Sequence, residues 1–286
     1  IFYSLLRLVR YYLSSFAENM VDSKAYNKSE LRVFRLNTGN INSCGELKRR
    51  AYKDSAEELV AALQIELNKR DDLHFANDQT ISLAAMETNN YSRNDLKITL
   101  KVFMSSSDFS QVIDCLNATK SLLGVESIEQ LIMSFNNFES ENEDSEDKEL
   151  KNWVGNVISE WEKIEALVKN GEISTVGVAD FDLNHLKALY DGAEVKPRIA
   201  HFNIAGCCSV PKDLQDYARE NDIQLLTHND PKPFVTEDGL KDICNNAKYP
   251  LCDHDYKPSW ASRYTVWVRG RSIIAAKGYM VQFERS

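Results

Sequence analysis

The chain has 286 residues, 34 Lys and Arg against 43 Asp and Glu, a net charge of -9, and six cysteines. The negative charge repels phosphate backbones and anionic lipid, which argues against nucleic acid or a membrane surface as a partner. The cysteines are too sparse for a disulfide scaffold and show no zinc-site spacing, so we expect a reducing, cytosolic compartment and no metal.

Residues 1–30 differ in character from the rest of the chain. Their first twenty residues are apolar, but Arg7 and Arg10 interrupt them, so no uncharged run approaches the ~20 residues that span a bilayer. We expect an N-terminal extension over 1–30 that is disordered or not native, with a targeting segment as the alternative. Residues 31–286 are then expected to form a single domain.

The first half of that domain shows a loose alternation of strand and helix. Ser55 and Glu58 have the spacing of a capping box ahead of an apolar helical face, which predicts a helix start. Gly124 is expected to close a helix that begins near residue 112. Strands are predicted at 32–39, weakly within 73–86, at 96–103 and at 127–133.

From residue 150 the alternation becomes regular. Trp153, Val157, Trp161 and Ile164 recur every three or four residues, as they do on one face of a helix. Strands then start near residues 173, 199 and 223, at intervals of 26 and 24 that fit a strand, a crossover helix and two short loops. With a last strand in the segment SIIAAKGYMVQF, the count reaches eight. The sequence therefore predicts an α/β fold, a (β/α)8 TIM barrel over 31–286.

Two segments depart from this rhythm. Residues 139–149 are dominated by carboxylates, a composition that predicts a solvated loop. Residues 231–260 make a segment that is too long for an ordinary connection between a strand and a helix. In a barrel, a long loop after the carboxyl end of a strand lies on the face where function is built. We therefore expect two long loops, at 139–149 and 231–260.

The stretch LLTHNDP, residues 225–231, brings three polar side chains to the end of the seventh predicted strand: His228, Asn229 and Asp230. A histidine beside a carboxylate can act as a base and its orienting group, but a nucleophile would have to come from elsewhere. Asn and Asp before proline also form turns routinely. The residues by themselves leave a turn, a binding surface and a catalytic role open.

Cys207 and Cys208 lie on a neighbouring strand-to-helix loop of the same face. A thiolate at a helix N-terminus has a lowered pKa and is reactive, whereas a buried cysteine is usually inert. Cys252 and His254 supply only two possible zinc ligands, which do not make a site. The sequence contains neither GxGxxG nor GxxxxGK[ST], so a nucleotide site is not indicated.

Two segments resemble the aldo-keto reductase family. ISTVGVADFDLNHLKAL, at 173–189, resembles its fifth-strand segment, and RNDLKITLKVF, at 93–103, resembles the segment that carries its catalytic lysine. The resemblance implies carbonyl reduction with NADPH and places that lysine at Lys101. It also implies a vestigial site, because Ser134 stands at the position of the catalytic histidine and no tyrosine precedes Lys101 at the family's spacing. Hydride transfer would then lack a proton donor.

The same resemblance implies that the nicotinamide pocket has changed. The residues that stand at its positions in this chain are Ala179, Asp180, His201 and His228, in place of the family's Ser, Asn, Gln and Tyr. We therefore expect no cofactor and no reductase activity, with Lys101 as a remnant of the catalytic group.

A narrower resemblance covers about residue 33 to the end of the chain. LLTHNDP, AGCC, LNTGNI and RSIIAAKGYM are similar to segments of the glutamate–cysteine ligase regulatory subunit family. This implies a non-catalytic protein that binds the catalytic (heavy) subunit of the ligase, favours its use of glutamate and weakens feedback inhibition by glutathione. The implied partner-binding candidates are His228, Asn229, Asp230, Cys207 and Cys208. An NADPH-dependent aldo-keto reductase and a thiol-based redox sensor are the alternatives.

Overall fold

The computed structural model describes residues 32–68, 80–82, 91–135, 146–205, 209–236, 238, 239, 243 and 256–285. Residues 33–286 form one compact unit. The predicted extension over 1–30, residues 139–145 of the acidic segment, and Cys207 and Cys208 lie outside the described residues. None of the described helices has both the length and the apolar content needed to cross a membrane.

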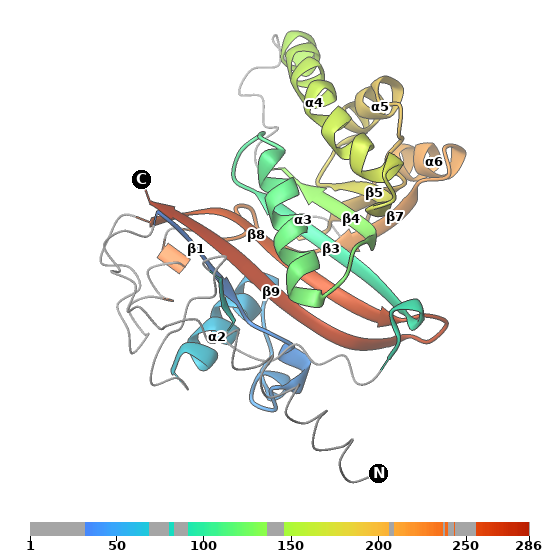
Figure 1. Cartoon of the computed structure of the whole chain (residues 1–286). Helices are drawn as coiled ribbons and strands as arrows, with labels where there is room; N and C mark the ends of the chain where they lie inside the picture. Colours follow the sequence, from blue (N-terminus) through green and yellow to red (C-terminus); the bar gives the residue numbers. More distant parts are fainter. Residues whose placement is uncertain are drawn as a thin grey trace. The chain divides into compact units, whose positions relative to one another are not determined.

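The described strands form one open sheet in the order β2-β1-β9-β8-β3-β4-β5-β6-β7 (Figure 1). The strands are β1 (Val33–Asn37), β2 (Thr80–Ser82), β3 (Leu96–Met104), β4 (Ile128–Ser134), β5 (Ile173–Ala179), β6 (Ile199–Asn203), β7 (Gln224–His228), β8 (Tyr256–Val268) and β9 (Ile273–Arg285). The helices are α2 (Ser55–Asn68), α3 (Ser110–Leu123), α4 (Glu146–Lys169), α5 (Leu183–Gly192) and α6 (Lys212–Glu220), with short 3₁₀ turns at Ile41–Ser43, Leu47–Arg49 and Arg93–Asp95.

The run from β3 to β7 confirms the predicted parallel architecture. Each of these strands pairs in parallel with the next, and α3, α4, α5 and α6 make the crossovers. The strands predicted near residues 173, 199 and 223 begin at 173, 199 and 224. Gly124 closes α3 as predicted, because its φ of 62° lets its N–H reach back to the last carbonyl groups of the helix.

The predicted α/β class is confirmed, but closure into a barrel is not seen among the described residues, where the sheet has two ends, at β2 and β7. The sheet also contains a strand, β8, that was not predicted: its first residues, 256–260, fall in the predicted long loop. β8 and β9 form an antiparallel hairpin of two 13-residue strands, which lies between β1 and β3. A hairpin joined by a short turn cannot add the parallel strand that a (β/α)8 barrel needs.

The bounds of both predicted long loops change as well. α4 begins at Glu146, so the last part of the acidic segment belongs to the helix. Carboxylates at a helix N-terminus interact favourably with its dipole, which explains why an acidic stretch can begin a helix. The second loop ends at Tyr256, where β8 begins. Pro258 conceals this strand in the sequence, because proline breaks the hydrogen-bond ladder, and the β8–β9 register indeed shifts between Pro258 and Trp260.

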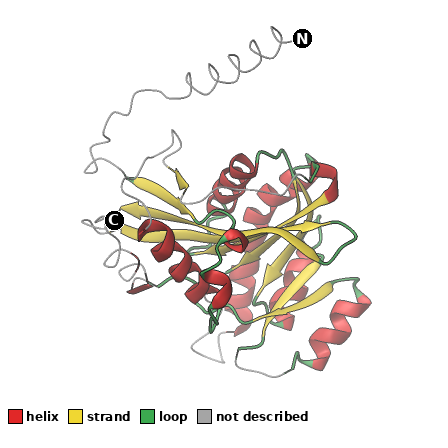
Figure 2. Ribbon diagram, turned by 90° about the horizontal axis from the view of Figure 1, so that it is seen from below, coloured by secondary structure: helices red, strands yellow, loops and turns green. Residues whose placement is uncertain are grey.

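The sheet carries helices on both faces (Figure 2). One core cluster packs the four helices α3, α4, α5 and α6 against the strands. Trp161 of α4 and Tyr264 of β8 are fully buried in this cluster. A second cluster packs α2 against the opposite face through Leu59, Leu63 and side chains such as Phe103 of β3 and Tyr279 of β9. Alternation along β3 therefore sends Leu100 and Val102 to the first core, and Lys101 and Phe103 to the α2 side.

Candidate functional site

A cluster of charged side chains lies on the α2 side of the sheet. We call it the Asp230 cluster; its members are Ser55, Lys101, His228, Asp230 and Arg263. Lys101 and Arg263 stand directly opposite one another in the β3–β8 register. Asp230 follows β7, two residues beyond the strand's end, and reaches both cations. The cluster thus joins three strands of the sheet to one helix.

Asp230 accepts hydrogen bonds from every side of this cluster. The Lys101 Nζ donates to Oδ2 at 2.7 Å. The Arg263 guanidinium donates to both carboxylate oxygens, at 2.7 and 3.2 Å, and the Ser55 hydroxyl donates to Oδ1. The side chains of Lys101 and Asp230 are each only 3% exposed. Since a buried charge is tolerated only with close partners, these contacts are what allow two cations and a carboxylate to lie beneath the surface.

Ser55 takes part in this cluster because it does not cap its helix. The predicted capping box of Ser55 and Glu58 is wrong: the side chain of Asp54 accepts from the backbone N–H groups of Ala56 and Glu57 instead. The helix still begins at Ser55, as predicted. Glu58, released from the cap, accepts from the Tyr279 hydroxyl and from Lys277 Nζ on β9.

His228 links Asp230 to a second buried carboxylate. The Asp230 backbone N–H donates to His228 Nδ1 at 3.1 Å, so Nδ1 is an acceptor and the other ring nitrogen, Nε2, faces away from Asp230. That nitrogen lies 3.2 Å from Asp180 Oδ1. Asp180 Oδ2 accepts from the Ser134 hydroxyl at 2.8 Å. Ser134 and His228, at the ends of β4 and β7, therefore lie on either side of the Asp180 carboxylate, which follows β5.

Asp180 occupies its position with an unusual backbone. Its φ is 67°, in the left-handed region that Asn and Asp adopt more readily than other residues with a side chain. Its N–H donates to the His201 carbonyl oxygen at 2.9 Å, which holds the chain in this conformation. The turn aims the Asp180 carboxylate back over the sheet toward His228, where its side chain is 3% exposed.

Burial and neighbouring charges shift the pKa values of these groups in opposite directions. Burial raises the pKa of both carboxyls, but hydrogen bonds and nearby charges outweigh this effect. His228 and Lys232 bring the pKa of Asp180 to about 2. His228, Arg263 and Lys101 hold the pKa of Asp230 below its usual range. Burial lowers the pKa of Lys101 to about 8, although the charge of Asp230 partly opposes the shift.

His201, beside His228, is neutral. Its ring lies 4.3 Å from that of His228, centroid to centroid, and its Nε2 lies 3.0 Å from the Thr227 carbonyl oxygen. Burial, together with the positive charge of Lys101, lowers the pKa of His201 to about 3. A neutral ring that donates from Nε2 to a backbone carbonyl serves to fix β6 against β7.

Acid should weaken the fold through Asp180. Its pKa is about 2 in the folded protein, against an ordinary value of 3.8, so the unfolded chain binds more protons between these values. The stabilisation is complete above pH 3.8 and is lost as the pH falls toward 2, a difference on the order of 2 kcal/mol. Across this pH range, the free energy of unfolding measured with urea should fall less steeply for Asp180→Asn than for the parent protein. Asn tolerates the left-handed backbone, and equal slopes would contradict the assignment.

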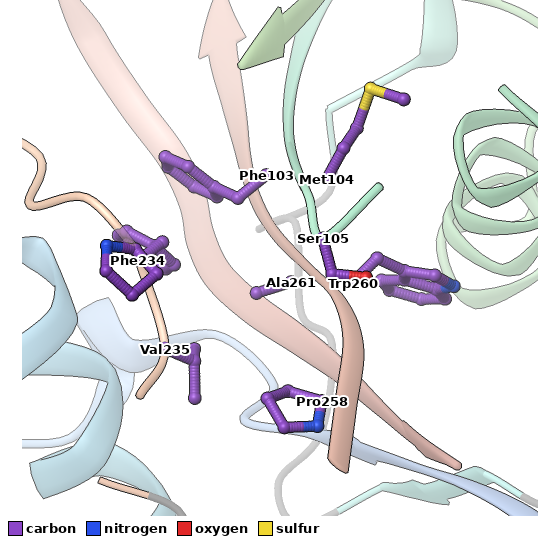
Figure 3. Close-up of a pocket in the computed structure, with 9 residues that line it drawn as sticks. Phe103, Met104, Ser105, Phe234, Val235, Pro258, Trp260 and Ala261 are labelled. Atoms are coloured by element: carbon purple, nitrogen blue, oxygen red, sulfur yellow. The ribbon is translucent and has the colours of Figure 1, made fainter. Parts of the chain in front are cut away.

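Aromatic rings lie beside Lys101 as well as the Asp230 carboxylate. Phe103 and Phe234 stack with ring centroids 3.6 Å apart, and Lys101 Nζ lies 5.1 Å from the Phe103 ring centroid. Both rings line a pocket of about 30 Å3, shown in Figure 3, which has room for a water or two. Tyr279, opposite Arg263 in the β8–β9 register, donates to Glu58. The charges of the cluster satisfy one another, and their evident effect is to hold the elements together.

The structure corrects two of the partner-binding candidates. We expected His228 and Asp230 to form part of a surface rim, but both are buried, and their polar atoms face Asp180, Lys101 and Arg263. Asn229 between them is exposed, with its Nδ2 3.3 Å from the Lys53 carbonyl oxygen. Of the three residues, only Asn229 has an exposed side chain.

Arg263 and Ser55 were not found from the sequence. Arg263 stands in the middle of the unpredicted strand β8, and Ser55 was assigned to a helix cap. Recognising β8 would have given a usable signal, since its antiparallel register places Arg263 beside Lys101. Among the described residues, no three His, Cys, Asp or Glu side chains gather as the ligands of a metal ion would.

Known proteins include close relatives of this chain. It is 32% identical to the human glutamate–cysteine ligase regulatory subunit over 264 residues, 89% of this chain and 93% of the human protein. The mouse protein of the same name is 33% identical over 263 residues, 88% of this chain and 93% of its own length. A solved aldo-keto reductase from a Medee basin deep-sea metagenome has 21% identity and a TM-score of 0.37, covering 48% of this chain and 44% of its own. That TM-score is too low to support an argument. No family model matches.

Proposed function

Because this chain belongs to the family of glutamate–cysteine ligase regulatory subunits, we propose that it regulates the ligase of glutathione biosynthesis by binding the catalytic subunit. The observation that carries this proposal is the 32% identity sustained over 93% of the human subunit. The names of its relatives state a regulatory role, and this chain takes that role without catalysing a reaction of its own. A cytosolic location, where the sparse cysteines stay reduced, is part of the proposal.

Regulation of this kind needs only a difference in affinity. If the chain binds one state of the catalytic subunit more tightly than another, it shifts the population toward that state without a reacting group of its own. We propose that the favoured state uses glutamate readily and resists glutathione. The buried, fully paired Lys101 is consistent with this role, because a group held between Asp230 and Phe103 is available for stability rather than for substrate.

Reconstitution tests the proposal. Purified catalytic subunit is assayed over a range of glutathione concentrations, with increasing amounts of this chain. We expect saturable relief of glutathione inhibition that reaches its plateau at one chain per catalytic subunit, and co-elution of the two on gel filtration. An unrelated protein of similar net charge is the control for non-specific stabilisation. If the two proteins neither co-elute nor change the inhibition curve, the proposal fails.

We predict no reductase turnover with NADPH on common aldehydes. Ser134 hydrogen-bonds Asp180 rather than offering an acidic proton, and Tyr279 is committed to Glu58. Neither group can protonate the alkoxide that hydride transfer creates. The assay follows NADPH absorbance at several protein concentrations, with Lys101→Met as the matched variant. Turnover that scales with the protein and disappears in Lys101→Met would overturn this prediction.

Three of the predicted contacts remain open to test. Asn229 is exposed, and we propose it as a contact for the catalytic subunit. Cys207 and Cys208 remain candidates for a disulfide between the subunits. Non-reducing gels of the complex, with each cysteine replaced in turn by serine, would detect such a bond as a heavier band that one variant loses.

A further inference from the structure

The end of the β8–β9 hairpin exposes apolar side chains. Ile273 is 47% exposed and Ile274 is 37% exposed, and the only other large apolar side chain exposed to this degree among the described residues is Ile204. Figure 1 shows the two strands running side by side to the turn that joins them. Two adjacent exposed isoleucines on one turn are unusual for a surface that only faces water.

The backbone edge beside these isoleucines is also uncovered in the described part of the chain. β1 pairs with β9 only as far as Met280, and Thr38 extends this contact by one bond to Tyr279. Beyond this point the Asn40 side chain makes the backbone hydrogen bonds that a neighbouring strand would make. Its Nδ2 donates to the Ala275 carbonyl oxygen, and its Oδ1 accepts from the Lys277 N–H. Ile273 and Ile274 lie beyond this last contact. An exposed sheet edge with apolar side chains is a ready site for a partner.

The sheet register places the Trp267 ring beside Ile274. Trp267 pairs directly with Ile274 on one side and with Lys97 on the other, so the three side chains share one face of the sheet. Trp267 is half-buried, and the α2 core does not include it. Tryptophan and arginine are the residue types that most often dominate the energy of protein interfaces, usually in a patch with an apolar centre.

The charge of the hairpin end is opposite to that of the chain. Residues 267–274 contain Arg269 and Arg271 and no carboxylate, whereas the whole chain has a net charge of -9. The Arg269 side chain is 48% exposed and forms an ion pair with Glu129 at 2.5 Å. A cationic rim around apolar anchors on an acidic protein selects a partner surface that is apolar at its centre and acidic at its edge.

We propose that this hairpin end, formed by Trp267, Ile273, Ile274, Arg269 and Arg271, is a contact surface for the catalytic subunit of the ligase. The occupant is an acidic-rimmed apolar surface of that subunit, seated over Trp267 and Ile274 on one face and reaching around the end of the hairpin to Ile273, which stands opposite Val268. The inference rests on the proposed function and adds the site at which it is exercised. Because a stable interface buries about 800 Å² on each partner, the hairpin end supplies the anchors of a larger contact rather than the whole of it.

The test compares two exposed isoleucine sites. The double variant Ile273→Asp/Ile274→Asp should raise the Kd for the catalytic subunit by at least about tenfold, while Ile204→Asp should change it by less than about twofold. All three side chains are exposed in the free protein, so the melting temperatures should stay close to that of the parent. A double variant that binds as tightly as the parent overturns the inference and leaves the proposed function intact. A parent protein that does not bind the catalytic subunit overturns both.

A second comparison tests the charge. Arg271→Glu should slow association with the catalytic subunit and remove much of its salt dependence, whereas Arg219→Glu, at a side chain 76% exposed on α6, should not. A membrane is the other possible occupant of a cationic, apolar surface. Sedimentation with vesicles of phosphatidylcholine and phosphatidylserine tests for it. If the parent sediments with these vesicles, the hairpin variants do not, and all bind the catalytic subunit equally, the surface belongs to a membrane and the inference is overturned.

Discussion

Replacing Asp230 by alanine is expected to lower the free energy of unfolding by about 3 to 5 kcal/mol, because it leaves the buried Lys101 and the partly buried Arg263 without their carboxylate. Lys101 Nζ and the Arg263 guanidinium both donate to Asp230, and Ser55 and the His228 ring are held against it. Urea unfolding at neutral pH measures the change. A loss of this size would show that the Asp230 cluster ties β3, β7, β8 and α2 into one cooperative unit.

Two variants give this experiment its controls. Lys101→Met removes the cation whose pKa burial lowers, and it leaves Asp230 paired with Arg263, so we expect a change of no more than about 1 kcal/mol. Asn229→Ala alters the exposed neighbour and should cost less than about 0.5 kcal/mol. If Asp230→Ala proves as stable as Asn229→Ala, the carboxylate is not the centre of the cluster. Binding to the catalytic subunit should then be compared only among variants that remain folded.

Gly278→Ala should be comparably destabilising, for a steric reason. A Cβ at this position would overlap the Gly39 carbonyl oxygen and the Tyr264 hydroxyl group. Tyr264 stands opposite Gly278 in the β8–β9 register, and its hydroxyl lies 2.8 Å from Gly39 O and 3.0 Å from Asn37 Oδ1. Overpacking and the displaced buried hydroxyl together should cost about 2 to 6 kcal/mol. Glycine at this point lets an aromatic side chain cross the neighbouring strand.

Gly155→Ala is the matched control for this substitution. Gly155 lies on the exposed side of α4, and an added Cβ there would meet nothing within 4 Å. Alanine favours the helix over glycine, so this change should raise the free energy of unfolding by about 0.5 to 1 kcal/mol. Thermal melting of the two variants should therefore move in opposite directions. If Gly278→Ala has the same melting temperature as the parent protein, Tyr264 does not lie against the glycine as described.

The sequence analysis succeeded where the information is local. The helix that begins at Ser55, the glycine that closes α3, and the parallel strands β5, β6 and β7 were all found within one or two residues. Apolar periodicity and turn residues within about 25 positions are enough to specify them. It failed at β8, because Pro258 makes the beginning of a strand look like a loop, and at the cap of α2, where Asp54 and Ser55 both suit the role.

The sequence by itself determined the family and the parallel run of strands, since each depends on residues close together in the chain. Only the tertiary structure decided that Asp230 is buried and Asn229 is not. Asp230 meets Lys101 across 129 positions and Ser55 across 175, and no local pattern records such distant partners. The order of the strands was decided in the same way, because the β8–β9 hairpin takes its place between β1 and β3 by register and packing with distant segments.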